Sequence, residues 1–189
     1  MHEQDAKKIV DEIFSLYTQH GQSDYIGEPV SQIEHMCQAA ELAEQEGYDE
    51  EVILAAFFHD LGHLCEYIMP VEQMEGVGVL DHESIGQDFL LARGFSKRIS
   101  TLVRSHVEAK RFLTYKHPDY YDKLSDASKL TLEHQGGVMT AAEADAFKAD
   151  PMFEDFIKMR TWDDLAKEKN KPLPDLERYK RMALAHLIR

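Results

Sequence analysis

Cysteine is scarce in this chain, and its two cysteines, Cys37 and Cys65, exclude the disulfide framework that stabilises many small secreted domains. We expect both to be small buried side chains on helices. No apolar run approaches the roughly 20 residues that a membrane-spanning helix needs. The polar start, Met1–Asp5, is not followed by a signal-peptide pattern. The sequence therefore predicts a soluble, cytoplasmic protein without a membrane partner.

Basic residues are also few, since 21 Lys and Arg stand against 35 Asp and Glu, which gives a net charge of −14. Binding to nucleic acid depends on a concentrated basic surface, so we expect no nucleic-acid partner. A small anionic substrate is compatible with this charge, because a few cations inside a pocket can bind one.

Strand-like alternation of polar and apolar residues is missing as well. Apolar side chains instead repeat at helical spacing. This pattern predicts helices over residues 5–20, 29–47, 50–66, 81–93, 96–113, 151–169 and 176–187. Shorter helices are expected to begin at Ser125 and Thr140, and breaks at 21–29, 67–80 and 117–119. A chain of 189 residues suits one domain, so we predict an all-α helical bundle with a single domain over 1–189.

The most apolar stretch covers residues 52–58 and leads directly into His59-Asp60. A run that is apolar on every side is typical of a buried helix or a buried strand, and its alanines and helical flanks favour a helix. Burying an unpaired carboxylate is costly, whereas a metal ion compensates it directly. A hydrogen-bonded His–Asp pair near the surface explains the dipeptide equally well, so this motif alone leaves both interpretations open.

The chain contains ten histidines, and three more of them fall at informative positions. His35 and His106 lie on the apolar sides of their predicted helices, and His82 lies at a helix start. Each alone is more often a histidine of the core than a metal ligand. Together with His59-Asp60, they favour a metal site, because imidazole and carboxylate suit iron, manganese and zinc.

The order His35, His59-Asp60, Asp163 resembles the signature of the HD superfamily, whose members are helical metal-dependent phosphohydrolases and a smaller set of diiron oxygenases. The resemblance implies a first metal held by His35, His59, Asp60 and Asp163. It also implies that Asp60 bridges to a second metal held by His82 and His106.

Further motifs narrow this resemblance. They are Tyr25-Ile26-Gly27-Glu28, Gln32-Ile33-Glu34-His35, His106-Val107-Glu108-Ala109-Lys110-Arg111, Tyr120-Tyr121, Leu124-Ser125-Asp126-Ala127-Ser128 and Arg160-Thr161-Trp162-Asp163-Asp164. As an ordered set they resemble the organophosphonate oxygenases, mixed-valent diiron enzymes of the HD superfamily that cleave a carbon–phosphorus bond. The resemblance covers roughly residues 25–164.

Four polar residues lie one helical turn from a proposed ligand: Gln32 before His35, His63 after His59, Lys110 after His106 and Arg160 before Asp163. Residues with this spacing share a helix face, so the four are expected to point towards one cavity. Three of them, His63, Lys110 and Arg160, are cationic or can become so and suit a phosphonate dianion, and Arg offers a fork of donors. The alternative is that these charges are solvated on outer helix faces.

The resemblance also implies the remaining roles. Ser128 joins Gln32, His63, Lys110 and Arg160 as a substrate-binding residue. Tyr25, Glu28 and His63 are implied to be catalytic, with the tyrosine occupying an iron coordination position until substrate arrives.

The sequence therefore favours an O2-dependent diiron oxygenase with two mixed-valent iron ions and a small phosphonate as substrate. The predicted substrate is 1-hydroxy-2-aminoethylphosphonate or its N-trimethyl analogue, giving phosphate and glycine or glycine betaine. One alternative is an HD phosphohydrolase acting on a nucleotide or small phosphate ester. Another is a catalytically silent HD-like scaffold, although such domains usually lose ligands. The substrate's amine substitution and the oligomeric state are left open.

Overall fold

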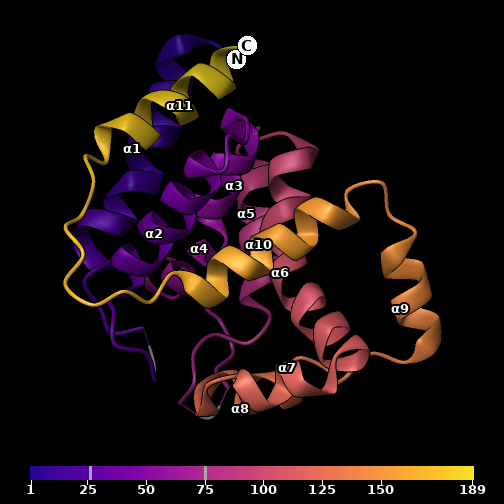
Figure 1. Cartoon of the computed structure of the whole chain (residues 1–189). Helices are drawn as coiled ribbons and strands as arrows, with labels where there is room; N and C mark the ends of the chain where they lie inside the picture. The colour runs from indigo at the N-terminus through magenta and orange to yellow at the C-terminus, as the bar shows by residue number, and fades with distance from the viewer. Residues whose placement is uncertain (26, 75) are drawn as a thin grey trace.

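The computed structural model describes residues 1–25, 27–74 and 76–189, and within these ranges the secondary structure is helical apart from two isolated β-bridges. The predicted all-α class is confirmed (Figure 1). The helices are α1 (Glu3–His20), α2 (Gln32–Gln45), α3 (Glu50–Phe58), α4 (Leu61–Leu64), η1 (Cys65–Tyr67), α5 (His82–Ala92), α6 (Lys97–Lys116), α7 (Pro118–Lys123), α8 (Asp126–His134), α9 (Ala141–Lys148), α10 (Phe153–Leu165) and α11 (Glu177–Ile188). Ile26, from the first quoted motif, lies outside the described residues.

Helix α3 lies at the centre of the bundle, and its residues 52–58 are all buried. It packs against α2, α6 and α11. The Phe57 ring stacks between Tyr17 and Tyr179, with centroid distances of 4.7 and 4.5 Å. The Tyr17 hydroxyl also donates a hydrogen bond of 3.2 Å to the Phe57 carbonyl. Aromatic packing from α1 and α11 thus fixes the end of α3, where His59 and Asp60 follow.

The longest helix, α6, packs against α3, α5 and α10. Helices α1 and α11 lie side by side, which brings the two chain termini together (Figure 1). Helices α7 and α8 lie at the opposite end of the molecule (Figure 1). No described helix is long and apolar enough to cross a membrane.

Two predicted helices end earlier than expected, each at a carbonyl that accepts a hydrogen bond from a histidine side chain. The helix predicted over 50–66 breaks at His59-Asp60, because the His59 Nδ1–H donates to the Ala56 carbonyl at 2.8 Å. The helix predicted over 151–169 ends at Leu165, and the Ala166 carbonyl accepts a hydrogen bond of 2.9 Å from His35 Nδ1. In both places a histidine side chain binds a carbonyl at a helix end.

The break predicted at 117–119 is partly wrong, because Pro118 begins the short helix α7. Proline is well suited to this position, since the first turn of a helix needs no N–H there. The caps were predicted correctly. Ser125 accepts a hydrogen bond from the Ser128 N–H, and Thr140 forms a capping box with Glu143. Cys37 and Cys65 are buried free thiols, as expected.

Candidate metal centre and anion pocket

Helices α2 and α3 bring His35 and His59 into direct contact. The Nδ1–H of His35 donates to the Ala166 carbonyl, and that of His59 donates to the Ala56 carbonyl. In a neutral imidazole whose Nδ1 carries the proton, Nε2 bears a lone pair. The two Nε2 atoms nevertheless lie only 3.0 Å apart. Two facing lone pairs repel each other unless a cation or a proton lies between them.

His82 at the start of α5 and His106 on α6 repeat this arrangement. Their Nδ1 atoms face the Val79 and Val103 carbonyls at 3.3 and 2.7 Å. Their Nε2 atoms are again 3.0 Å apart. The chain therefore contains two separate pairs of buried imidazoles, and within each pair the two Nε2 lone pairs face each other.

Asp60 lies between the two pairs. Its Oδ1 is 3.4 Å from His82 Nε2 and 3.3 Å from His106 Nε2. Its Oδ2 is 3.5 Å from His35 Nε2 and 3.4 Å from His59 Nε2. This geometry is that of a carboxylate able to bridge two cations.

Asp163, from the last turn of α10, completes the first group. Its Oδ1 lies 3.2 Å from His35 Nε2 and 4.0 Å from His59 Nε2. The structure thus brings all the proposed ligands together, in a set of four donors and a set of three that share Asp60.

The electrostatics of this cluster fit cations. Burial opposes ionisation of Asp60, yet the neighbouring histidines, chiefly His59 and His106, hold its carboxyl pKa well below the usual range. Burial also disfavours a charged His35, but the Asp163 and Asp60 carboxylates outweigh it and raise the pKa of His35 to about 9. Asp60 Oδ2 has no hydrogen-bond partner among the described residues. Facing nitrogens and an orphaned buried oxygen are what two bound metal ions would satisfy.

A cavity of about 160 Å³ adjoins the cluster and is lined by Asp60, His82, His106 and Asp163 from the metal centre. Every predicted substrate-binding and catalytic residue also lines it: Tyr25, Glu28, Gln32, His63, Lys110, Ser128 and Arg160. The sequence prediction of one shared cavity is therefore in accord with the structure.

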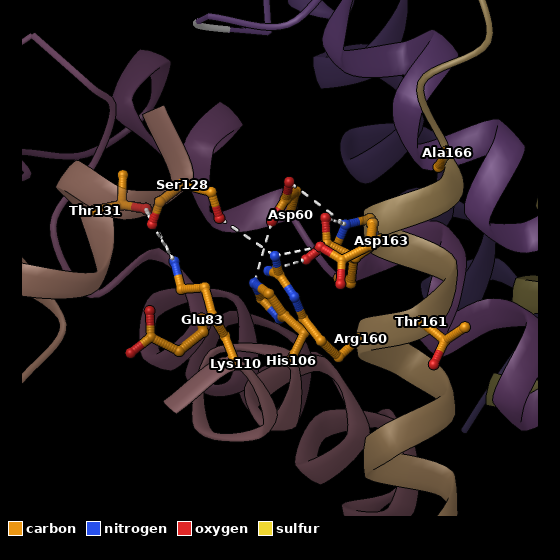
Figure 2. A network of polar contacts seen from close by, with 12 residues as sticks. Asp60, Glu83, His106, Lys110, Ser128, Thr131, Arg160, Thr161, Asp163 and Ala166 are labelled. Atoms are coloured by element: carbon orange, nitrogen blue, oxygen red, sulfur yellow. Dashed lines mark hydrogen bonds and ion pairs between the residues drawn. The ribbon is translucent and has the colours of Figure 1, made fainter. Parts of the chain in front are cut away.

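Lys110 supplies the cavity with a cation that has no acidic partner in the part of the chain that the structure describes. Its side chain is buried, and among the described residues no carboxylate lies within ion-pair distance of it. Its ammonium donates to Thr131 Oγ1 at 2.9 Å and to the Ser128 carbonyl at 3.4 Å (Figure 2). Burial and the nearby Arg160 lower the pKa of Lys110 to about 7. A buried cation without a counter-ion favours an anionic ligand.

Arg160 is buried too, but its charge is compensated. Its Nη1 donates to Asp163 Oδ2 at 2.6 Å (Figure 2). Its Nη2 pairs with Asp164 Oδ1. Nη2 also donates to Ser128 Oγ at 3.3 Å, and Nε donates to the Tyr120 hydroxyl at 2.8 Å. Arg160 therefore holds a proposed metal ligand as well as lining the cavity.

Tyr25 and Glu28 lie in the loop before α2. The Tyr25 ring stacks on His35 with 4.1 Å between ring centroids. Burial, followed by the Asp60 charge, raises the pKa of Tyr25 well above its usual value, so its phenol stays protonated. The Glu28 carboxylate accepts hydrogen bonds of 2.7 Å from both Lys167 and Ser125.

Gln32 and His63 line the same cavity. Gln32 is buried at the first turn of α2, and its Oε1 has no described hydrogen-bond partner. The His63 ring stacks on His82 at 4.0 Å, and His63 Nδ1 accepts a hydrogen bond from the Val79 N–H. Burial and His82 hold the pKa of His63 well below its usual value. A neutral His63 with an accepting Nδ1 carries its proton on Nε2.

Two residues of this region, Thr131 and Lys167, were not predicted from the sequence, and two more, Tyr120 and Asp164, were quoted in motifs without a predicted role. Thr131 follows Ser128 by three residues on α8, so helical spacing could have found it. Lys167 lies in a loop and reaches Glu28 across 139 positions, a contact that no local pattern signals.

Comparison with known proteins agrees with this architecture. The model of the HD domain family matches residues 33–183, and the chain therefore belongs to the HD domain family. An uncharacterized protein of Acanthamoeba polyphaga mimivirus is 42% identical over 178 residues, which cover 94% of this chain and 81% of that protein.

Two further relatives carry functional names. One, from Gimesia maris, is named hydroxymethylphosphonate dioxygenase and is 39% identical over 173 residues, 90% of this chain and 84% of the relative. The other, from Leisingera caerulea, is named [1-hydroxy-2-(trimethylamino)ethyl]phosphonate dioxygenase (glycine-betaine-forming). It is 37% identical over 167 residues, 88% of this chain and 84% of the relative. Together with the His/Asp cluster, these relatives show that the chain is a metal-using oxygenase of the HD family. They favour this class over the phosphohydrolase and the silent scaffold.

Proposed function

We propose that this oxygenase cleaves the carbon–phosphorus bond of a 1-hydroxyalkylphosphonate with O2, using a mixed-valent pair of iron ions. The resemblance of its motifs favours the 2-amino and 2-trimethylammonio ethylphosphonates, which would give glycine and glycine betaine besides phosphate. The name of the Gimesia maris relative adds hydroxymethylphosphonate. The observation that carries the proposal is the pair of facing imidazoles on each side of Asp60, next to the unpaired Lys110.

The four donors His35, His59, Asp60 and Asp163 would hold one iron, and His82, His106 and Asp60 the other. When bound, the iron pair would supply Lewis acidity and one-electron chemistry with O2, which no side chain here can supply. The backbone carbonyls that hold each Nδ1–H keep every Nε2 aimed at its metal position.

The phosphonate would bind at the end of the cavity formed by α6 and α8. Lys110 contributes a positive charge with no acidic partner among the described residues. Thr131 contributes a hydroxyl group beside Lys110, and Ser128 contributes one beside Arg160. Arg160 lies next to Ser128 and has one N–H of Nη1 without an acceptor among the described residues. These groups would orient the anion so that its C1 carbon faces the metal centre.

Other side chains would control access and protons. Tyr25 covers His35 and would be displaced when the substrate enters, since its ring occupies the metal side of the cavity. Glu28 and Lys167 would anchor the loop that carries it. His63 would donate its Nε2 proton to a substrate oxygen, and Gln32, whose amide oxygen is free, would accept a hydrogen bond from the substrate hydroxyl.

The test is a measurement of O2 uptake and phosphate release with each of the three phosphonates. We expect phosphate and consumed O2 in equal amounts with at least one of them, and no phosphate under argon. His82→Ala should abolish the reaction, whereas His134→Ala, a change at an exposed histidine of α8, should not. Release of phosphate from nucleotides without O2 at a comparable rate would contradict the proposal and favour the phosphohydrolase.

A further inference from the structure

Arg160 belongs to a closed ring of hydrogen bonds whose other two members, Tyr120 and Asp164, are not among the residues that line the cavity. The Arg160 Nε–H donates to the Tyr120 hydroxyl at 2.8 Å. That hydroxyl donates in turn to Asp164 Oδ2 at 2.6 Å, and Asp164 Oδ1 accepts from Arg160 Nη2. Tyr120 belongs to α7, whereas Arg160 and Asp164 belong to α10.

This ring restricts the orientation of the Arg160 guanidinium. A guanidinium has five N–H donors in one plane. Tyr120 and Asp164 take two of them on one edge, Asp163 takes one of Nη1, and Ser128 takes one of Nη2. The N–H that remains is the second one of Nη1. Its direction is therefore decided by Tyr120 and Asp164 as much as by Asp163.

Helix α7 has no buried residue, so apolar packing contributes little to its position. The Tyr120 hydroxyl is a polar tether between this helix and α10. Because α8 follows α7 directly and provides Ser128 and Thr131, the same tether influences the position of the Thr131 hydroxyl next to Lys110 and of the Ser128 hydroxyl next to Arg160.

We propose that Tyr120 and Asp164 are positioning residues that fix the orientation of the Arg160 guanidinium, so that its remaining Nη1 N–H is directed at the substrate's phosphonate group. Neither residue touches the substrate. Both act through Arg160, whose planar donors bind an oxyanion well only when the plane is held in place. The inference rests on the proposed function for the identity of the anion, but the ring itself does not depend on it.

The variants Tyr120→Phe and Asp164→Asn test this role in the metal-loaded protein. Calorimetry with methylphosphonate, which has no C1 hydroxyl group, reports anion affinity separately from turnover. We expect affinity to fall about fivefold to twentyfold in each variant, which is less than the loss of a whole hydrogen bond to a charged group, because the Arg160 donor is misdirected and not removed. For the phosphonate that is turned over, KM should rise by a similar factor while kcat changes less than about twofold, because a positioning defect in binding spares the chemical step.

The chain offers a matched control for each variant. Tyr121→Phe removes the neighbouring hydroxyl on α7, where the ring is exposed, and Glu154→Gln neutralises an exposed acid on α10. Both controls should keep wild-type affinity. The double variant Tyr120→Phe/Asp164→Asn should lose less than the product of the single effects, because both residues act on one guanidinium.

Metal content should stay at the wild-type level in all these variants, since Asp163 keeps its bond from Arg160. Methylphosphonate affinity and KM that are unchanged, or improved, in both single variants would overturn the proposal. Failure of the proposed function has a different signature, because the wild-type protein would then release no phosphate from any of the three phosphonates in the presence of O2.

Discussion

Lys110 and Arg160 have the same formal charge and line the same cavity, but their surroundings give them different roles. Lys110 has hydroxyl and carbonyl partners, whereas Arg160 is compensated by Asp163 and Asp164. The pocket therefore owes its attraction for anions mainly to Lys110. Arg160 adds directional donors and supports a proposed metal ligand.

This difference predicts separate effects of two alanine substitutions. Lys110→Ala should lower kcat/KM at least tenfold with metal content unchanged, because a hydrogen bond to a charged group is worth ~1.5–3 kcal/mol and ~1.4 kcal/mol is a factor of ten. Arg160→Ala should lower both kcat/KM and metal content, because Asp163 Oδ2 loses its 2.6 Å donor. Metal analysis together with steady-state kinetics of the two variants tests both expectations. Equal, full metal loading in both variants would contradict the supporting role of Arg160.

The lowered pKa of Lys110 also predicts a pH dependence of kcat/KM. Its pKa is lowered to about 7 by burial and by Arg160, so the cation is present below this pH and is lost as the pH rises through it. We expect kcat/KM to decrease above pH 7, since the free enzyme's essential groups shape that profile. Lys110→Arg keeps its charge at every accessible pH and should remove this decrease. If the decrease persists unchanged in Lys110→Arg, it arises from another group or from the substrate.

At the scale of the elements, the close approach of α4 and α5 decides where Asp60 and His82 meet. Gly62 makes this approach possible, because a Cβ atom built there would lie 1.8 Å from the His82 carbonyl oxygen. Gly86 on α5 is less tightly enclosed, because a Cβ atom built there would lie 3.2 Å from its nearest neighbour, Val103 Cγ1. An added methyl group is therefore expected to clash severely at Gly62 and only mildly at Gly86.

Gly62→Ala should therefore force α5 away from α4 and weaken the second metal position, which depends on His82. Overpacking of a well-packed core typically costs about 1–3 kcal/mol, and we expect at least this loss of unfolding free energy together with reduced metal content. Gly86→Ala should have a smaller effect on both. Denaturant unfolding and metal analysis of the two variants give the comparison, and wild-type metal loading in Gly62→Ala would argue against the role of this interface.

The sequence predicted the helical elements well and their irregular ends poorly. Apolar periodicity placed α1, α2, α5, α6 and α11, because these helices each bury one side. It missed the break at His59-Asp60 because apolar periodicity does not report a side-chain bond to the backbone, here from His59 to the Ala56 carbonyl three residues earlier. It missed the early end of α10 at Leu165 because His35, which is distant in the sequence, donates to the Ala166 carbonyl. The helical start at Pro118 was mistaken for a break, since proline both ends and begins helices.

For the whole molecule, the candidate site depends on contacts between α2, the α3–α4 junction, α5, α6 and α10. One-turn spacing predicted that the polar residues near each ligand line one cavity, as the structure shows. It could not predict that Lys167 reaches Glu28, because this contact depends on tertiary packing. The pairs of Arg160 with Asp163 and Asp164 have i,i+3 and i,i+4 spacing on α10, so helical spacing could have predicted them. Asp164, which the motif contained without a predicted role, is part of the ring behind the pocket.

The central claim is that Asp60 bridges two metal positions, each with its own pair of histidines. Iron analysis of the protein as isolated, combined with Mössbauer spectroscopy, tests it most directly in the wild type and in His82→Ala and His106→Ala. We predict about two irons per chain in the wild type, as imidazole and carboxylate donors allow, and mainly the first iron in each variant. Variants that retain both irons, or a wild type that binds only one, would contradict the account.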